Sequence, residues 1–265
     1  MAKGAAALNA NINEFYDASM FSPQLVSYYG GSDYTNFGYR TEASQDARTA
    51  CDALMARLLS FIPSPHGSVL DVACGKGETT RYLSRHFAPD KITAINISEK
   101  QLARGRQNVP GATFRLMDAT ALEFADASFD AVVCVEAAFH FNTREKFLAE
   151  ALRVLKPGGH LVLSDILISQ TAEGTHQRRI SDNYVPDLAA YRALYERAGF
   201  TLEVLDDATE FSWRNHFMHL VNFAHEALLD KKVTREQLQR SLNLYYDRAG
   251  YIDHYVLAGA AKPLR

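Results

Sequence analysis

Short apolar runs with the length of β-strands alternate with helical stretches between residues 68 and 164. Each run is rich in Val, Ile and Leu throughout rather than at every second position, which indicates strands that are buried on both faces. Such a sheet is usually parallel, with helices as the crossovers between strands. The pattern therefore predicts an α/β fold. The runs are Ser68–Val72, Lys91–Asn96, Thr113–Met117, Ala131–Glu136 and His160–Ser164.

Helices and two further strands are expected around these runs. Capping residues, prolines and glycines mark the ends of the helices. The last two strands are expected at Phe200–Leu205 and Tyr251–Ala260. The helices are expected at Gln45–Phe61, Glu78–Phe87, Ser98–Asn108, Thr143–Leu155 and Pro186–Ala198.

Two helical additions flank or interrupt this series of strands. Residues 1–62 show no strand alternation, and residues 209–248 look helical although they lie between the last two strands. We expect the first segment to form a helical N-terminal lid. The core is then expected at 63–265, with a helical insertion at about 209–248.

Composition narrows the class of partner. Of the 265 residues, 47% are hydrophobic and 22% are charged, and the formal net charge is −3. Nucleic-acid-binding proteins are usually basic, so no nucleic-acid partner is expected. The N-terminus lacks the apolar centre of a signal peptide, no run is long enough to span a membrane, and Cys51, Cys74 and Cys134 have no metal-type spacing. We therefore expect a cytoplasmic protein with no membrane or metal partner. The oligomeric state is left open.

A glycine-containing loop follows the first strand, with the sequence Asp71-Val-Ala73-Cys-Gly75-Lys-Gly77. Small residues in such a loop let the backbone approach a ligand closely, although a tight strand–helix turn is the alternative. A dinucleotide fingerprint would need a third glycine where Thr80 stands, and a phosphate-binding P-loop would need Gly-Lys-Ser/Thr. The acid at the strand end suits a cationic amino-acid ligand better than a pyrophosphate.

This loop resembles motif I of the class I S-adenosylmethionine (SAM)-dependent methyltransferases. The resemblance continues in order along about residues 68–205. It implies a Rossmann-like seven-stranded sheet with the last strand antiparallel, SAM as cofactor and a small-molecule acceptor. The further matching segments are Ile95–Ser98, Met117–Ala119, Ser128–Val132 and Arg153–Gly159.

The resemblance also implies which residues meet each part of SAM. The amino-acid end is expected over Asp71, Ala73 and Gly75. The ribose diol usually meets an acid after the second strand, but here that residue is Asn96, which cannot make the charge-assisted hydrogen bonds of a carboxylate. We therefore expect help from Gln101. Asp118 and Ala119 are expected to contact the adenine. The other expected cofactor contacts are Cys74, Gly77, Ile97, Val135, Glu136 and Phe37.

His140, just after the fourth strand, is the candidate general base. A hydroxyl acceptor must lose its proton as it attacks, and histidine is suited to this near neutral pH. The residue resembles the base of natural-product sugar O-methyltransferases and phosphoethanolamine methyltransferases, with packing or substrate contact as the alternative. Asp165 is expected to orient His140 or hold the acceptor hydroxyl, unless it faces solvent. Glu136 is expected to support the cofactor side or the loop.

Aromatic residues are concentrated in the first 40 residues, which suits a cover that shields a sulfonium and closes over substrate. Tyr16 falls where phosphoethanolamine methyltransferases keep a catalytic tyrosine, with packing of the lid as the alternative. Tyr28, Tyr184 and Trp213 are further candidates for acceptor contact. His216 and His219 lie one helical turn apart, but no fitting partner ligands make them a metal site.

The expected function is O-methylation of a small molecule, in specialised metabolism. N- or C-methylation on the same scaffold is the alternative, because the presence of His140 favours a hydroxyl acceptor only mildly. Two readings of another class stay open: a SAM-binding protein without turnover, suggested by Asn96, and a nicotinamide-dependent oxidoreductase.

Overall fold

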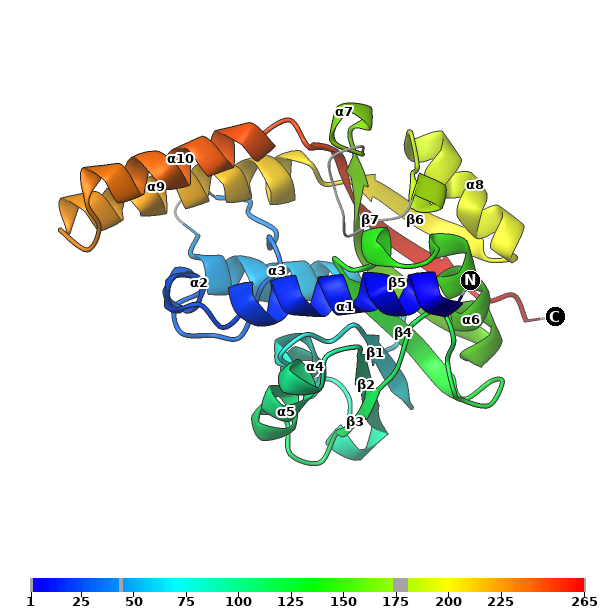
Figure 1. Ribbon diagram of the computed structural model, residues 1–265. Coiled ribbons are helices and arrows are strands. Elements are labelled where there is room, and N and C mark those ends of the chain that lie inside the picture. Colours follow the sequence, from blue (N-terminus) through cyan, green and yellow to red (C-terminus); the bar gives the residue numbers. More distant parts are fainter. Residues whose placement is uncertain (1, 43–44, 174–180, 265) are drawn as a thin grey trace.

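A single mixed sheet of seven strands forms the centre of the molecule (Figure 1). The computed structural model describes residues 2–42, 45–173 and 181–264. The strand order is β3-β2-β1-β4-β5-β7-β6, and β7 runs antiparallel to both of its neighbours. The predicted fold is therefore confirmed. The strands are β1 Val69–Val72, β2 Ile92–Asn96, β3 Thr113–Leu116, β4 Phe129–Val135, β5 Leu155–Ile168, β6 Thr201–Asp207 and β7 Ile252–Ala261.

Helices cover both faces of the sheet, which is why the central strands are apolar throughout. One buried cluster joins the sheet to α6 and α8, and a second joins it to α3 and α4. The principal helices are α1 Ala2–Ser19, α2 Pro23–Tyr28, α3 Ala47–Leu59, α4 Glu78–Leu83, α5 Glu99–Asn108, α6 Arg144–Val154, α7 Gln170–Glu173, α8 Leu188–Ala198, α9 Asn215–Leu229 and α10 Arg235–Arg248. Among the described residues, none of the helices has both the length and the apolar character of a membrane span.

The strand order reverses between β1 and β4, which are neighbours in the sheet although β2 and β3 separate them in sequence. In an open parallel sheet, chains leave the two strands in opposite directions at such a point and a crevice opens beyond the carboxyl ends. The glycine loop and the turn that carries His140 follow β1 and β4, respectively. The topology therefore brings the two candidate segments to one crevice.

The N-terminal segment divides into two parts with different roles. Helix α3 packs on the sheet beside α4, and Leu54, Met55 and Leu58 are fully buried there. Helix α1 instead crosses the front of the molecule, over the loops that follow the strands (Figure 1). Only the part before α3 therefore has the geometry of a cover over the crevice.

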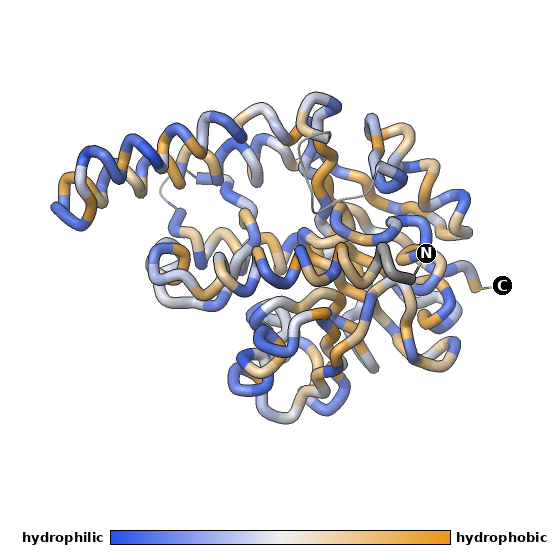
Figure 2. Tube along the Cα trace, viewed as in Figure 1, coloured by the Kyte–Doolittle hydropathy of each residue, from blue (hydrophilic) through white to orange (hydrophobic). Residues whose placement is uncertain are grey.

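Several expected boundaries differ from the structure. Strand β5 begins at Leu155 rather than at His160, because the chain stays extended through Lys156–Gly159 and a shift in register takes up the irregularity. Helix α4 ends at Leu83, short of the expected Phe87. The insertion consists of a short π-helical turn and two helices, α9 and α10, which project as a pair away from the sheet (Figures 1 and 2).

Candidate active site

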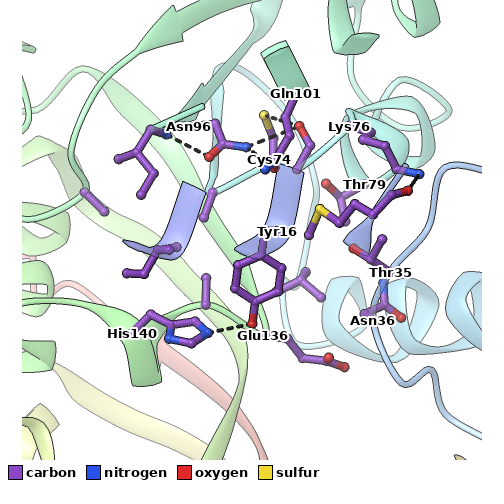
Figure 3. Close-up of a pocket in the computed structure, with 18 of the residues that line it drawn as sticks. Tyr16, Thr35, Asn36, Cys74, Lys76, Thr79, Asn96, Gln101, Glu136 and His140 are labelled. Atoms are coloured by element: carbon purple, nitrogen blue, oxygen red, sulfur yellow. Dashed lines mark hydrogen bonds between the residues drawn. The ribbon is translucent and has the colours of Figure 1, made fainter. Parts of the chain in front are cut away.

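A pocket lies beyond the carboxyl ends of β1, β2, β3 and β4 (Figure 3), and α1 crosses over it (Figure 1). Its wall combines the glycine loop, the residues that follow β2, β3 and β4, one face of α1 and the loop around Phe37. Most of the expected cofactor residues line it. These are Ala73, Cys74, Gly75, Asn96, Ile97, Gln101, Asp118, Ala119, Val135, Glu136 and Phe37.

The two glycines of the loop serve different purposes. A Cβ atom on Gly75 would meet no protein atom within 4 Å, so this residue faces the open pocket. A Cβ atom on Gly77 would lie 2.7 Å from the Cα of Gly105, where α4 packs against α5. Gly77 is not among the residues that line the pocket. Gly77 therefore packs against another helix and does not line the pocket, where a cofactor contact was expected. The motif alone could not distinguish these two roles of a glycine.

Asp71 lies one layer behind the pocket wall rather than in it, contrary to the expectation of a direct contact. One carboxylate oxygen accepts hydrogen bonds from the hydroxyls of Thr79 (2.8 Å) and Thr80 (2.6 Å), and Thr79 lines the pocket. The other oxygen is buried without a partner among the described residues. Burial raises the pKa of Asp71 to about 6. The acid therefore orients the start of α4.

The side-chain amide of Asn96 forms hydrogen bonds to other groups of the protein. Its oxygen accepts from the backbone N–H of Ile97 (2.7 Å), while its nitrogen donates to Gln101 Oε1 (2.9 Å) and to the carbonyl of Gly75 (3.3 Å). Gln101 in turn donates to the carboxylate of Asp17 on α1 (2.8 Å). A carboxylate is thus present behind the ribose-side residues, but it comes from the lid. Sequence reasoning missed Asp17, because nothing in its surroundings marks it.

Polar contacts hold α1 over the pocket. Asn9 donates to the carboxylate of Asp118 (2.9 Å), and Asn13 donates to the backbone carbonyl of Ile97 (2.7 Å). Near the C-terminal end of the helix, the ammonium of Lys100 donates to the carbonyl of Asp17 (2.8 Å), where a cation is favoured by the helix dipole. Helix α1, the lid, therefore lies in a closed position over the pocket.

Tyr16 and His140 meet in the pocket wall. Tyr16 Oη lies 2.6 Å from His140 Nε2, and the two rings are edge to face with centroids 5.3 Å apart (Figure 3). Both residues line the pocket. Tyr16 comes from α1 and His140 from the short turn Ala138–His140 after β4, so the pair exists only when the lid is closed.

Glu136 is a buried acid in the same wall, beside the Tyr16–His140 pair. Its Oε1 accepts hydrogen bonds from the backbone N–H of Phe37 (2.7 Å) and from the hydroxyl of Tyr255 (2.6 Å). Burial raises the pKa of Glu136 to about 8, and a positive φ of 49° turns the residue towards the pocket end of β4. A cation in the pocket would lower this pKa by stabilising the carboxylate.

Asp165 does not reach His140 or the pocket, which corrects the expectation that it orients the base or holds the acceptor. Its carboxylate is fully buried and forms an ion pair with Arg144 (Nε to Oδ2, 2.7 Å), and it also accepts from the hydroxyl of Tyr191 (3.1 Å). The pocket wall does not include it. Strand β5 presents this residue to the face covered by α6 and α8.

The ion pair of Asp165 acts on the His140 turn through two intermediates. The backbone N–H of Arg144 donates to Asn183 Oδ1 (2.6 Å). Asn183 Nδ2 donates to the carbonyl of Ala138 (3.0 Å), which begins the turn that ends at His140. Asp165 is therefore a positioning residue, and Arg144 and Asn183 are site-supporting residues that sequence reasoning did not single out.

The other expected acceptor contacts lie outside the pocket wall. Tyr28 is buried, and its hydroxyl lies 3.3 Å from His216 Nδ1 and 3.1 Å from His219 Nδ1. Trp213 packs against the ring of Phe37, and Tyr184 follows the short turn at Ser181–Asn183. None of these side chains lines the described pocket. The aromatic density of the N-terminal segment thus partly reflects packing.

Within the described ranges, no group of three His, Cys, Asp or Glu side chains is arranged to hold a metal ion. His216 and His219 instead surround the hydroxyl of Tyr28 together with the guanidinium of Arg40. Burial lowers the pKa of both histidines, and most strongly that of His216. The cluster therefore forms a packed support behind Phe37.

The pocket fits SAM by the chemistry of its wall. Gly75 leaves open space over the loop, backbone groups and amides gather after β2 and β3, and a buried acid lies after β4 where a sulfonium would find a counter-charge. Asn13 Oδ1 is a buried acceptor in this wall without a partner among the described residues. These features match the amino-acid, nucleoside and cationic parts of that cofactor.

Comparison with known proteins agrees with this geometry. A family model described as a methyltransferase domain matches residues 70–163. The chain is 31% identical to dimethylglycine N-methyltransferase of Parasynechococcus marenigrum, over 94% of this chain and 87% of that protein. It is also 31% identical to 27-O-demethylrifamycin SV methyltransferase of Amycolatopsis mediterranei, over 76% and 77% of the two chains.

Among solved structures, the [4+2]-cyclase SpnF has the same fold, with a TM-score of 0.74, 21% identity and 97% of each chain covered. At this identity the likeness concerns the fold alone. The two sequence relatives, in contrast, match over most of their length, which removes the nicotinamide oxidoreductase alternative. The chain therefore belongs to the SAM-dependent small-molecule methyltransferases, with SAM as its methyl donor.

Proposed function

We propose that the protein methylates a hydroxyl group of a small molecule, with His140 as the base that removes the acceptor proton. The observation that carries this proposal is the 2.6 Å contact between Tyr16 Oη and His140 Nε2 in the pocket wall. When bound, SAM supplies an electrophilic methyl group on its sulfonium. The protein must then align the acceptor oxygen, exclude water and take up a proton.

The contact also defines where the acceptor proton goes. An acceptor hydroxyl in the pocket either replaces Tyr16 Oη beside His140 Nε2 or donates to that oxygen. In the second arrangement, the phenol passes its proton to the imidazole and receives the acceptor proton, so Tyr16 is unchanged. Both arrangements leave the proton on His140, a side-chain type that protonates and releases near neutral pH.

The open and polar parts of the wall suggest which residues would hold the cofactor. Ala73, Cys74 and Gly75, with Thr79 at the side, would hold the amino-acid end. Asn96 would lie beside the ribose, and Ile97 and Asp118 would contact the adenine. In this placement Glu136 would supply a counter-charge to the sulfonium, and the Tyr16–His140 pair would face the acceptor.

N-methylation is the second candidate, and Glu136 is the observation that favours it. A buried carboxylate beside the base can hold a cationic amine by charge and hydrogen bonding, while His140 removes the proton that the amine must lose. The likeness to a protein named dimethylglycine N-methyltransferase supports this candidate. The likeness to a rifamycin methyltransferase supports a natural-product hydroxyl instead.

The test is methyl transfer from SAM to a panel of small alcohols, phenols and amines, followed by mass spectrometry of the products. With the best acceptor, His140→Ala is expected to lower kcat about 10²–10⁴-fold while the Kd for SAM stays within about threefold. Tyr16→Phe should lower kcat less, since the imidazole remains. Glu136→Gln should lower the turnover of amines more than that of hydroxyl acceptors if the amine is the true acceptor.

Three results would contradict the proposal. Wild-type kcat in His140→Ala at neutral pH would exclude its role as base. Transfer to amines alone, with no methylated hydroxyl in the panel, would replace O-methylation by N-methylation. S-adenosylhomocysteine binding without any methylated product would instead support a SAM-binding role without turnover.

A further inference from the structure

The lid helix α1 places an unused hydrogen-bond acceptor in the cofactor pocket. Asn13 Oδ1 is buried and has no hydrogen-bond partner among the described residues, although Asn13 lines the pocket. Its amide orientation is determined by its neighbour: Nδ2 lies 2.7 Å from the carbonyl of Ile97, which can only accept. The atom left facing the pocket is therefore the oxygen, and it needs a donor.

The polar groups of the opposite wall of the pocket already form hydrogen bonds within the protein. Both N–H groups of the Asn96 amide donate within the protein, to Gln101 and to the carbonyl of Gly75, and its oxygen accepts from the N–H of Ile97. Gln101 is likewise paired through both ends of its amide, to Asn96 and to Asp17. The strand side therefore offers a ligand hydroxyl little beyond one spare lone pair on Asn96.

We propose that Asn13 binds the ribose of SAM, accepting a hydrogen bond from one of the ribose hydroxyls. This inference rests on the cofactor placement given above, in which the ribose lies beside Asn96. Asn13 bonds the carbonyl of the very next residue, Ile97, so its free oxygen is held at that end of the pocket. A buried acceptor that is costly when unpaired thus becomes paired by the ligand.

The inference gives the lid a second role besides excluding water. Asn13 and Tyr16 lie three residues apart and face the same pocket from α1. A ribose held by Asn13 therefore stabilises the closed position of the helix that brings Tyr16 to His140. Cofactor binding therefore favours the position of α1 in which the proton-accepting pair forms.

The experiment compares S-adenosylhomocysteine with its 2′-deoxy and 3′-deoxy analogues by isothermal titration calorimetry. In the wild-type protein, at least one deoxy analogue is expected to bind about tenfold more weakly, as for one lost hydrogen bond. Asn13→Ala should bind S-adenosylhomocysteine about tenfold more weakly, and removal of that hydroxyl should then cost less than about threefold.

Asn9→Ala is the matched control. Asn9 lies one turn earlier on the same face and also holds the lid closed, but its interaction is with the Asp118 carboxylate. Its loss should weaken all three ligands by one common factor and leave the hydroxyl dependence intact. The melting temperatures of both variants are measured as well, so that unfolding can be excluded as the cause of weaker binding.

The outcomes separate the two proposals. If wild-type protein binds S-adenosylhomocysteine but the hydroxyl dependence is the same in Asn13→Ala, the role of Asn13 is wrong and the cofactor placement stands. If neither deoxy analogue binds more weakly than the parent to wild-type protein, the ribose does not lie at Asn96, and both the cofactor placement and the role of Asn13 are wrong.

Hydrogen exchange supplies a second readout. The parent ligand should protect the backbone amides of residues 8–20 in Asn9→Ala but not in Asn13→Ala. Equal protection in both variants would overturn the inference.

Discussion

The two halves of the pocket, called the cofactor half and the acceptor half after the roles proposed above, are built in different ways. The cofactor half, beyond β1, β2 and β3, is made largely of residues that follow a strand within one short motif each. The acceptor half, beyond β4, combines Tyr16 from α1, Phe37 from a loop, His140 from a turn and a buried acid supported by Tyr255 from β7. The first half is thus largely a local property of the chain, apart from the side chains of α1 that cover it. The second half exists only after distant segments have packed.

The largest expected effect tests the local half. Gly75→Leu puts a side chain into space where no protein atom lies within 4 Å, so the protein can accommodate it only by filling the cofactor site. We expect the Kd for SAM to rise on the order of 10³-fold or more, about 4 kcal/mol, by calorimetry. Gly75→Ala is the smaller control, because Ala73 in the same loop already tolerates a positive φ of 57°. Unchanged SAM titration in Gly75→Leu would contradict the loop assignment.

A smaller effect, on stability, tests the support of the acceptor half. Asp165→Asn leaves the buried guanidinium of Arg144 without its counter-charge, which should lower the free energy of unfolding by about 3 kcal/mol in urea titrations. The double variant Arg144→Met/Asp165→Leu should recover part of the loss, since no buried charge remains unpaired.

Activity of the folded Asp165→Asn protein separates positioning from catalysis. Because the described contacts join Asp165 to the His140 turn through Arg144 and Asn183 rather than directly, the pH profile of kcat/KM should keep its wild-type midpoint. A shift of that midpoint would mean that Asp165 acts on the imidazole directly, as the sequence had suggested.

The smallest expected effect concerns Glu136, at the border between the halves. Its pKa is raised by burial from 4.5 to about 8, so the folded state holds a proton that the unfolded state has lost above pH 4.5. Stability of the ligand-free protein should therefore fall as pH rises towards 8, by roughly 2 kcal/mol between pH 6 and 8, and level off above that.

Glu136→Gln isolates this contribution in urea titrations across the same pH range. The glutamine oxygen can still accept from the N–H of Phe37 and the hydroxyl of Tyr255. The buried histidines His216 and His219 have lowered pKa values and contribute the opposite slope below about pH 7 in both proteins. The difference between the two proteins should therefore grow from pH 6 to 8. A constant difference would show that Glu136 is already ionised in the fold.

The predicted fold and most of the cofactor half were recoverable from the sequence for a physical reason. Strands buried on both faces must be apolar throughout, and a loop that approaches a ligand needs small residues, so both requirements leave contiguous signals at Val69–Val72 and Ala73–Gly77. Even there, the motif did not separate Gly75, which faces the pocket, from Gly77, which faces another helix.

The acceptor half was harder to predict because side chains of the same type serve opposite purposes there. Tyr16 and Tyr28 lie in the same aromatic segment, yet one lines the pocket and the other supports a buried cluster. Asp165 and Glu136 both lie near the carboxyl end of a strand, yet one pairs with Arg144 on the far face and the other enters the pocket wall. Which face a strand-end residue takes depends on local twist and on what packs opposite.

The order of strands and helices along the chain, the family and the loop assigned to the cofactor could be predicted from the amino-acid sequence, since hydrophobic burial and backbone geometry act on neighbouring residues. Three features emerged only once the chain was folded: α1 closes the pocket, Asp17 and Asn13 lie on the side assigned to the cofactor, and Asp165 turns away from it. These features depend on hydrogen bonds between residues as much as 124 positions apart, as in the Tyr16–His140 contact. Such bonds are selected by the packing of whole elements, and leave no periodic signal along the chain.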